Sequence, residues 1–215
     1  MEAEGGTDLA LPPEMLERVF SSLNLQDLKA SLQVCRRWRE AGEAPGLWAR
    51  VCLRASRESM AGLQEALPGR RMLLVRELRL EGEGPVSEGL LEEVVRHGGL
   101  TSLALQGSDL SSVDPWLLEG LVKGLQELEL EGTQLAGGQQ EVIFQSVVLG
   151  TKLKKLRVTS SDLSSVEPSL LAQAASRLEE VELASTGLTC HQIEAILRAL
   201  NSEARLARLD LSGNN

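Results

Sequence analysis

Residues 11–48 read LPPEMLERVFSSLNLQDLKASLQVCRRWREAGEAPGLW, a pattern typical of several short helices in succession. Proline suits the first turn of a helix and disfavours the helical conformation in the residue before it, so a helix should begin near Pro12 or Pro13. The apolar residues that follow recur at spacings of three and four, which gives this helix one broad apolar face. A second helix should begin near Asn24, whose side chain can cap it, and a third should cover residues 33–41.

The same stretch ends with residues that interrupt a helix and then resume an apolar pattern. Glycine and proline residues break the chain before Leu47 and Trp48, which should continue an apolar face with Val51 and Leu53. About 45 residues of short helices carry more apolar surface than they can bury among themselves. The surplus should therefore face a partner or the next domain.

The order of these residues resembles the F-box family. The family pattern is Leu-Pro-x-Glu-(apolar)-Leu, an apolar-Phe pair, Asp-Leu, Val-Cys-(basic)-(basic)-Trp and a late Leu-Trp, and every part of it is present between Leu11 and Trp48. The resemblance implies an all-helical F-box over residues 11–53 that docks on the Skp-type adaptor of cullin-based ubiquitin ligases, and through it on a cullin. Carried over position by position, the docking surface and its supporting core are Leu11, Pro12, Met15, Leu16, Phe20, Leu28, Val34, Cys35, Trp38, Leu47 and Trp48. The sequence does not divide these residues into contacts and core.

From Val75 onward one sequence pattern recurs, here called the phrase: an apolar residue, two others, an apolar residue, one other and an apolar residue. Its six copies are Val75/Leu78/Leu80, Leu100/Leu103/Leu105, Leu125/Leu128/Leu130, Leu153/Leu156/Val158, Leu178/Val181/Leu183 and Leu206/Leu209/Leu211. Successive copies begin 25, 25, 28, 25 and 28 residues apart, which is the spacing of leucine-rich repeats. A Ser, Thr or Asn eight residues after the start of the last five copies should bond to backbone groups where the chain turns.

A longer period of 53 residues overlies the short one. SDLSSVDP at residues 108–115 returns as SDLSSVEP at residues 161–168. The proline of each copy should lie in the first turn of a helix, and Thr189 with Gln192 is typical of a capping box. A period that spans two repeats resembles the alternating repeats of the ribonuclease-inhibitor type. This resemblance implies a curved α/β solenoid with parallel strands on the concave face and helices on the convex face.

The chain thus divides into four segments: a flexible tail over residues 1–10, the F-box over 11–53, a helical connector over 54–74, and about six leucine-rich repeats over 75–215. The last repeat is incomplete, because no helical pattern follows its strand phrase. We therefore expect the final strand to be partly bare and its amides to exchange quickly, unless further protein or a partner covers it.

The side chains between the phrase leucines should line the open face of the sheet, because alternate residues of a strand point to opposite faces. Two rows of charge should result: Glu127, Lys155, Glu180 and Arg208 in one, and Glu129, Arg157 and Glu182 in the other. Two interpretations remain open. Opposite charges can pair across neighbouring strands, or Glu127, Glu129, Lys155, Arg157, Glu180 and Glu182 form the centre of a target-binding surface.

Composition narrows the classes of function. The formal net charge of −9 opposes nucleic acid as a partner, and the three cysteines have neither disulfide nor metal-ligand spacing. The N-terminal residues lack an apolar run that could act as a signal or membrane span, so we expect no membrane partner and a cytoplasmic or nuclear location. We identify no catalytic, metal or cofactor-binding residues: His97 and His191 lack partners for a triad, and no phosphate loop is present.

The combination resembles the F-box/leucine-rich-repeat class of substrate receptors. It implies a non-catalytic subunit of a Skp-cullin-F-box type ubiquitin ligase, in which the F-box docks the adaptor and the repeats bind an unknown target protein for ubiquitination. The alternative is a leucine-rich-repeat scaffold or inhibitor that binds a partner without ubiquitin transfer.

Overall fold

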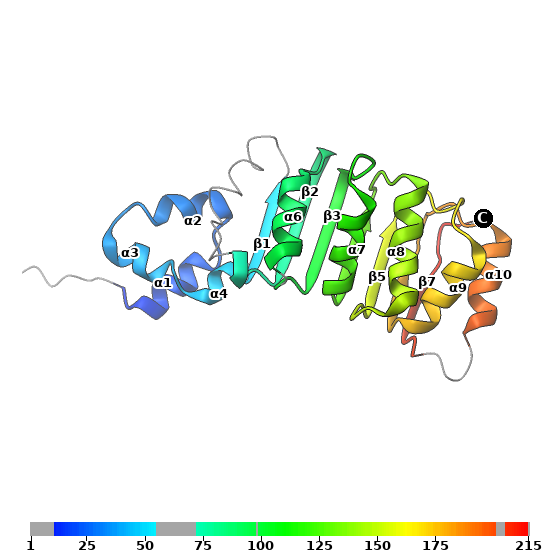
Figure 1. Cartoon of the computed structure of the whole chain (residues 1–215). Coiled ribbons are helices and arrows are strands. Elements are labelled where there is room, and N and C mark those ends of the chain that lie inside the picture. Colours follow the sequence, from blue (N-terminus) through cyan, green and yellow to red (C-terminus); the bar gives the residue numbers. More distant parts are fainter. Residues whose placement is uncertain (1–10, 55–71, 98, 201–204, 215) are drawn as a thin grey trace, which may run out of the picture.

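The computed structural model of the chain describes residues 11–54, 72–97, 99–200 and 205–214. Four short helices form one end of an elongated molecule, and a parallel sheet with a single layer of helices forms the rest (Figure 1). The predicted flexible tail over residues 1–10 lies outside the described residues, and so does the larger part of the predicted connector.

The N-terminal helices begin and end close to where the sequence places them. They are α1 (Pro13–Phe20), α2 (Leu25–Ser31), α3 (Arg36–Ala41) and α4 (Pro45–Trp48). Asn24 caps α2 as predicted, because its side-chain oxygen accepts a hydrogen bond of 2.9 Å from the backbone N–H of Asp27.

The prediction of a third helix over residues 33–41 is wrong at its start. Gln33 and Val34 instead continue a turn, since their backbone N–H groups donate to the carbonyls of Ala30 and Ser31 at 3.1 and 3.2 Å. Cys35 is extended, with φ at −158°, and the helix begins only at Arg36.

Seven parallel strands form one sheet in chain order. They are β1 (Arg50–Arg54), β2 (Glu77–Pro85), β3 (Ser102–Asp109), β4 (Glu127–Glu131), β5 (Lys155–Thr159), β6 (Glu180–Glu182) and β7 (Arg208–Asp210). Burial alternates along β4 and β5, so the phrase leucines point into the core and the residues between them point to the open face, as predicted.

Helices follow the strands and cover one face of the sheet (Figure 1). A short 3₁₀ helix, η1 (Met72–Leu74), precedes β2; the others are α6 (Glu88–His97), α7 (Pro115–Gly124), α8 (Gly137–Gly150), α9 (Pro168–Arg177) and α10 (Cys190–Ala199). Leucine, valine and isoleucine from the strands and helices form a single apolar core that also includes Leu16, Phe20 and Trp48 of the N-terminal helices. The core therefore runs through both parts of the described chain.

Strand β1 is a seventh copy of the repeated phrase that the sequence analysis did not identify. Trp48, Val51 and Leu53 stand at the three apolar positions, and the register aligns Val51 with Leu78 and Leu53 with Leu80. Residues 50–53 are therefore part of the sheet rather than part of an all-helical segment. Of the predicted connector over residues 54–74, Arg54 ends this strand, residues 72–74 form the 3₁₀ turn, and residues 55–71 lie outside the described chain.

One hydrogen-bond pattern joins each strand to the next at its start. A single carbonyl in one unit accepts the backbone N–H groups of two successive residues in the next unit, at 2.7–3.3 Å. The six accepting carbonyls belong to Ala49, Arg76, Thr101, Gln126, Lys154 and Glu179. Because Ala49 directly follows α4 and obeys the same pattern, the N-terminal helices connect to the sheet as one more unit of the same architecture.

Buried polar side chains stabilise the turns between strands and helices, as the sequence predicts for its Ser, Thr and Asn positions. Thr133 N–H donates to the Ser161 hydroxyl at 3.1 Å, and Thr186 N–H donates to Asn214 Oδ1 at 3.0 Å. The predicted capping box is confirmed, since Thr189 Oγ1 accepts from the Gln192 N–H and Gln192 Oε1 accepts from the Thr189 N–H. These bonds remove the cost of burying turn backbone without partners.

The 53-residue period also appears in hydrogen bonding. Gln192 Nε2 donates to the carbonyls of Leu163 and Val166, and Gln139 Nε2, 53 residues earlier, donates to those of Leu110 and Val113, all at 2.6–3.1 Å. Both glutamines are buried. Each glutamine holds the turn of the preceding unit against the glutamine's own helix.

At the last strand the phrase leucines are less covered than elsewhere. Leu209 and Leu211 are half-buried, whereas Leu156 and Val158 at the same positions of β5 are each 1% exposed.

Candidate functional site

The N-terminal helices pack around an aromatic pair. Phe20 of α1 meets Trp38 of α3 edge to face, with ring centroids 5.3 Å apart and planes at 65°. Arg37 Nη2 donates to the carbonyl of Leu11 at 2.5 Å, which holds the chain before α1 against α3. The relative position of α1 and α3 is thus set by both an apolar and a polar contact.

The structure divides the eleven predicted adaptor-binding residues by their exposure. The buried ones, which belong to the core, are Leu16, Phe20, Leu28 and Trp48. Trp38 and Leu47 are half-buried, and the exposed ones are Leu11, Pro12, Met15, Val34 and Cys35. Only the exposed and half-buried residues can contact a partner without rearrangement of the core.

Three exposed apolar side chains belong to α1 and to the chain just before it. Met15 and Val19, four residues apart on the same side of α1, are 49% and 46% exposed, and Leu11, two residues before the helix, is 46% exposed; these three residues are here called the α1 stripe. Val34, in the turn before α3, is 62% exposed. Val19 is absent from the predicted set, although its spacing of four from Met15 was a sufficient signal.

Trp48 has a structural role in this arrangement. Its side chain is fully buried, and its indole N–H donates to the Gly42 carbonyl at 2.8 Å. It ends α4 and also occupies the first apolar position of the β1 phrase. Trp48 therefore supports both the helices and the first strand rather than forming part of an exposed surface.

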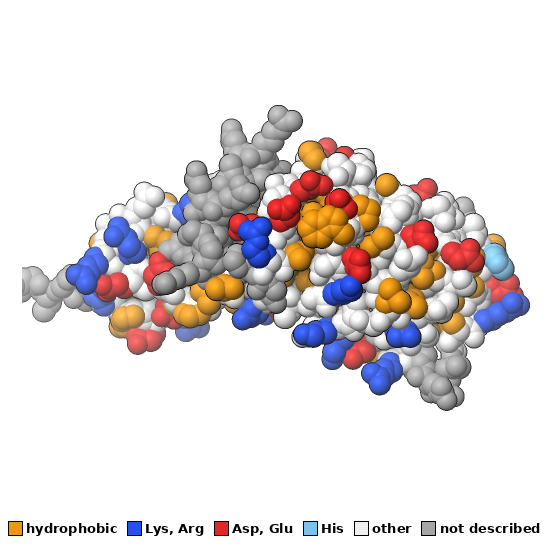
Figure 2. All heavy atoms as spheres, viewed as in Figure 1, with side chains coloured by type: hydrophobic (Ala, Val, Ile, Leu, Met, Phe, Trp, Pro, Cys, Tyr) orange, Lys and Arg blue, Asp and Glu red, His pale blue; other side chains and the backbone are white. Residues whose placement is uncertain are grey.

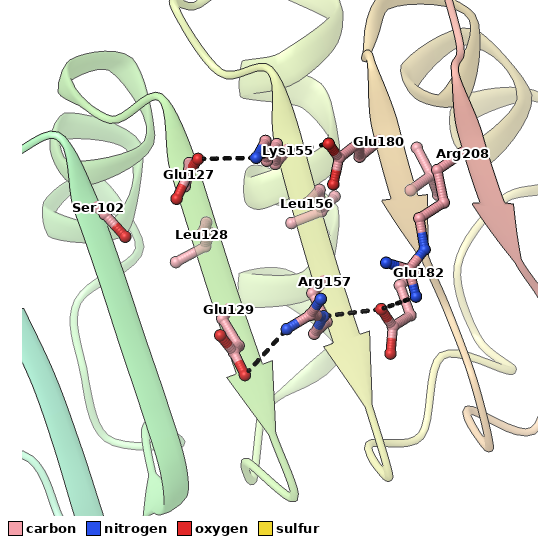
Figure 3. A pocket seen from close by; sticks show the side chains of 11 residues that line it. Ser102, Glu127, Leu128, Glu129, Lys155, Leu156, Arg157, Glu180, Glu182 and Arg208 are labelled. Carbon is pink, nitrogen blue, oxygen red and sulfur yellow. Dashed lines mark hydrogen bonds and ion pairs between the residues drawn. The ribbon is translucent and has the colours of Figure 1, made fainter.

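The second candidate surface lies on the open face of the sheet, where the predicted rows of charge are in register. Lys155 stands between Glu127 and Glu180, and Arg157 stands between Glu129 and Glu182. These six residues, here called the charged face, line a depression of about 140 Å³ together with Ser102 and Arg208 (Figure 3).

Each cation of the charged face bridges the carboxylates of both neighbouring strands. Lys155 Nζ lies 3.1 Å from Glu127 Oε1 and 3.4 Å from Glu180 Oε1. Arg157 lies 3.4 Å from Glu129 and 2.8 Å from Glu182 (Figure 3). Opposite charges therefore pair across neighbouring strands, as the first of the two interpretations predicts.

The ion pairs extend on both sides of the charged face. Arg208 Nη2 of β7 reaches Glu182 Oε2 at 3.9 Å. Arg79 Nη2 of β2 reaches Glu129 Oε2 at 3.4 Å, across the small side chain of Ala104, which the register places between them. An arginine or glutamate at position 104 would block that path. Sequence reasoning missed this contact because it joins strands that are not neighbours.

The carboxylates change the titration of Lys155. Glu127 accepts a hydrogen bond from the Lys155 ammonium and attracts it by charge, and Glu180 does the same to a smaller extent. Both raise the pKa of the ammonium above its ordinary value of 10.5. Lys155 is therefore cationic at neutral pH and up to its ordinary pKa of 10.5 and beyond. The charged face carries its cations in a fixed pattern rather than as a pH-sensitive site.

Among the described residues, no group of three or more His, Cys, Asp or Glu side chains is placed to hold a metal ion. Within the same residues, no helix is both long and apolar enough to span a bilayer.

Comparison with known proteins gives a match for the N-terminal helices. Residues 9–54 match the F-box-like family. A segment of 45 residues is 44% identical to F-box only protein 24 of Macaca fascicularis and 42% identical to F-box only protein 24 of Homo sapiens. The matched segment is 21% of this chain and 8% of each relative. The chain therefore carries an F-box-like domain at its N-terminal end, and it matches only a small part of the length of these curated relatives.

Proposed function

We propose that this protein is a non-catalytic substrate receptor of a Skp-cullin-F-box type ubiquitin ligase. The F-box-like domain docks a Skp-type adaptor, and through it a cullin, while the strands and helices after it bind a target protein. The observation that carries the proposal is the combination of the F-box-like match over residues 9–54 with the exposed apolar side chains of the same segment.

The α1 stripe and Val34 are the proposed adaptor contacts. Exposed apolar side chains in a continuous row are costly unless a partner covers them, and they are typical of interaction surfaces. Leu16 and Phe20 of the same helix are buried in the core and hold α1 in place, and Leu28 of α2 is buried as well. Removal of a well-packed anchor from such an interface commonly costs 2 kcal/mol or more of binding free energy.

We further propose that residues 75–215 form a leucine-rich-repeat solenoid. Two observations support it: the strands are parallel and in chain order, and the same hydrogen-bond pattern recurs at the start of each. In such a solenoid the face opposite the helices is a long surface made from one or two side chains per strand. The charged face is the proposed centre of target binding.

A target that binds the charged face has to replace the existing ion pairs with equally good ones. Lys155 and Arg157 each already contact two carboxylates, so a partner with a single charge gains little there. A partner whose own charges alternate in the opposite order can match both rows at once. Specificity would then come from the pattern of charge rather than from its net sign.

Ubiquitin transfer would follow from proximity. An adaptor at the α1 stripe and a target on the sheet would be held by one continuous core, which raises the effective concentration of target lysines near the ubiquitin-charged enzyme. We propose the cytoplasm, the nucleus or both as the place of this activity. The scaffold or inhibitor function differs from this only in lacking the cullin.

The test is affinity capture of the full chain with the proteasome and cullin neddylation blocked, compared with two variants. Met15→Glu should lose both the adaptor and the cullin, whereas the charge reversal Lys155→Glu with Arg157→Glu should keep both and lose target proteins. A deletion of residues 1–53 is a poor control because β1 pairs with β2. Adaptor without cullin in the wild-type capture supports the scaffold function, and retention of both by Met15→Glu contradicts the proposed docking surface.

A further inference from the structure

An exposed tryptophan stands on the helix side of the molecule. Trp116, the second residue of α7, is 56% exposed, and within the described part of the chain no aromatic ring stacks on it. A tryptophan in contact with water leaves a large apolar surface uncovered, and tryptophan is among the residues most enriched at the centres of protein interfaces.

Two neighbouring helices, α6 and α7, carry carboxylates around the start of α7. The backbone N–H of Asp114 donates to Glu88 Oε1 at 3.2 Å, and Gly120 of α7 lies against Val95 of α6, so the two helices run side by side. Glu92 stands one turn after Glu88 on α6, and Glu119 stands one turn after Trp116 on α7. Figure 2 shows the result, a broad apolar patch over α6 and α7 with acidic side chains at its border. We name Glu88, Glu92, Asp114, Trp116 and Glu119 the Trp116 patch.

The 53-residue period supplies an internal comparison. Leu117 and Leu118 of α7 correspond to Leu170 and Leu171 of α9, and both helices begin with a proline. The residue that corresponds to Trp116 is Ser169. The same helix start therefore forms without the indole, which shows that Trp116 is not needed for the fold of this position.

Two of the four border carboxylates are likewise confined to the first unit. The apolar residues of α6 have their counterparts in α8 53 residues later: Leu90 and Ile143, Leu91 and Phe144, Val94 and Val147. At the border positions, however, Glu92 corresponds to Gln145 and Glu119 to Ala172. The core is repeated while the aromatic residue and two of its carboxylates are not, so these residues serve something other than the core.

We propose that the Trp116 patch binds a basic segment of a partner protein, with an arginine side chain stacked on the indole ring. The face of an indole attracts a cation, and guanidinium is the cation that both stacks on aromatic faces and bonds to carboxylates in a fixed geometry. Four carboxylates stand in the patch, and only Glu119 has an ion-pair partner among the described residues, Lys123. An acidic partner would be repelled, and a purely apolar one would bury these carboxylates without compensation.

The patch lies on the opposite side of the sheet from the charged face. Trp116 belongs to the helix layer, whereas Lys155 and Arg157 point to the open face. A partner at the patch would therefore leave both the charged face and the α1 stripe free. The inference does not depend on the proposed ligase function.

The experiment is a titration of the full chain with a fluorescein-labelled twelve-residue peptide that carries two Arg-Leu pairs between Gly and Ser residues, followed by anisotropy. Trp116→Ser, which copies Ser169, should weaken binding by about tenfold. Glu92→Gln, which copies Gln145, should weaken it by about threefold. Glu141→Gln is the matched control, because Glu141 corresponds to Glu88 in the second unit and lacks a tryptophan beside it; it should leave binding unchanged.

Three results would overturn the proposal. Equal binding by wild type and Trp116→Ser, with unchanged circular dichroism, would show that the indole makes no contact. Equal binding of a peptide with leucine in place of arginine would show that the surface selects apolar rather than basic segments. Self-association in sedimentation that Trp116→Ser abolishes, without peptide binding, would assign the patch to a second copy of the chain.

Discussion

The α1 stripe of the F-box-like domain and the charged face of the sheet are both exposed surfaces, but they differ in the partners of their side chains. Leu11 before α1, and Met15 and Val19 on it, each leave about half of the residue exposed to solvent. On the sheet, Lys155 and Arg157 each lie between two carboxylates of their own chain. As the proposed docking surface, the first would gain free energy by binding a partner, whereas the charges of the second are already paired within the chain. Substitutions on the two surfaces should therefore have different kinds of effect.

The largest effect should come at the residue that joins the two regions. Trp48→Ala removes a fully buried side chain that belongs to both α4 and the first strand phrase, so it should lower the free energy of unfolding by about 3–5 kcal/mol. Urea unfolding followed by circular dichroism measures this. Trp116→Ala is the control and should change the stability by less than about 1 kcal/mol. An equally small change for Trp48→Ala would show that the domain and the sheet are independent.

On the F-box-like domain, Met15→Glu should affect binding and leave stability nearly unchanged. The side chain is 49% exposed, so a charge there is solvated in the free protein but must be desolvated against an apolar partner surface. We expect adaptor affinity to fall by about 30-fold or more, measured by calorimetric titration. Glu17→Ala, at an exposed position of the same helix, is the control. Trp38→Ala is less informative, since it also breaks the contact with Phe20.

In the sheet region, a buried polar residue should matter more than the visible charges. Gln192→Ala removes donors to the carbonyls of Leu163 and Val166 and should destabilise by about 2 kcal/mol. Gln139→Ala should have a similar effect, because the Gln139 side chain donates the corresponding two hydrogen bonds 53 residues earlier. Gln145→Ala, on the surface of α8, is expected to change the unfolding free energy by less than about 0.5 kcal/mol.

On the charged face, Arg157→Met should reduce stability by only about 0.2–1 kcal/mol. Its side chain and those of its partners remain in contact with water, so the ion pairs are screened. The loss should shrink further in high salt. A loss of several kcal/mol, independent of salt, would mean that the charged face is structural and would argue against its role in target binding.

The smallest effect is a pH dependence at Lys155. Because the folded state raises the pKa of this ammonium above 10.5, the ion pairs stabilise the protein fully below that pH and lose this contribution as the pH rises through the folded-state pKa. The difference in urea midpoint between wild type and Lys155→Met should stay constant from pH 7 to about pH 10 and shrink as the pH rises past 10.5. A difference that grows with pH would contradict the assignment.

Local patterns in the sequence predicted much of this structure. The phrase leucines predicted six strands and the face of each, and Asn24 and Thr189 predicted helix starts, because capping and alternation depend on residues close in sequence. The seventh strand was missed because Trp48 stands where the other copies have an aliphatic residue, and because the F-box pattern explained Trp48 already. The division of the F-box residues into core and surface, and the contact of Arg79 with Glu129 across Ala104, depend on tertiary packing and could not be predicted from local spacing.

The most direct test of the central claim is amide exchange of the full chain with and without a purified Skp-type adaptor. We expect slower exchange in α1 and in the turn before α3, with no change in the strands that carry the charged face. Slower exchange confined to β4–β6, or no change anywhere at saturating adaptor, would contradict the claim that the α1 stripe is the docking surface.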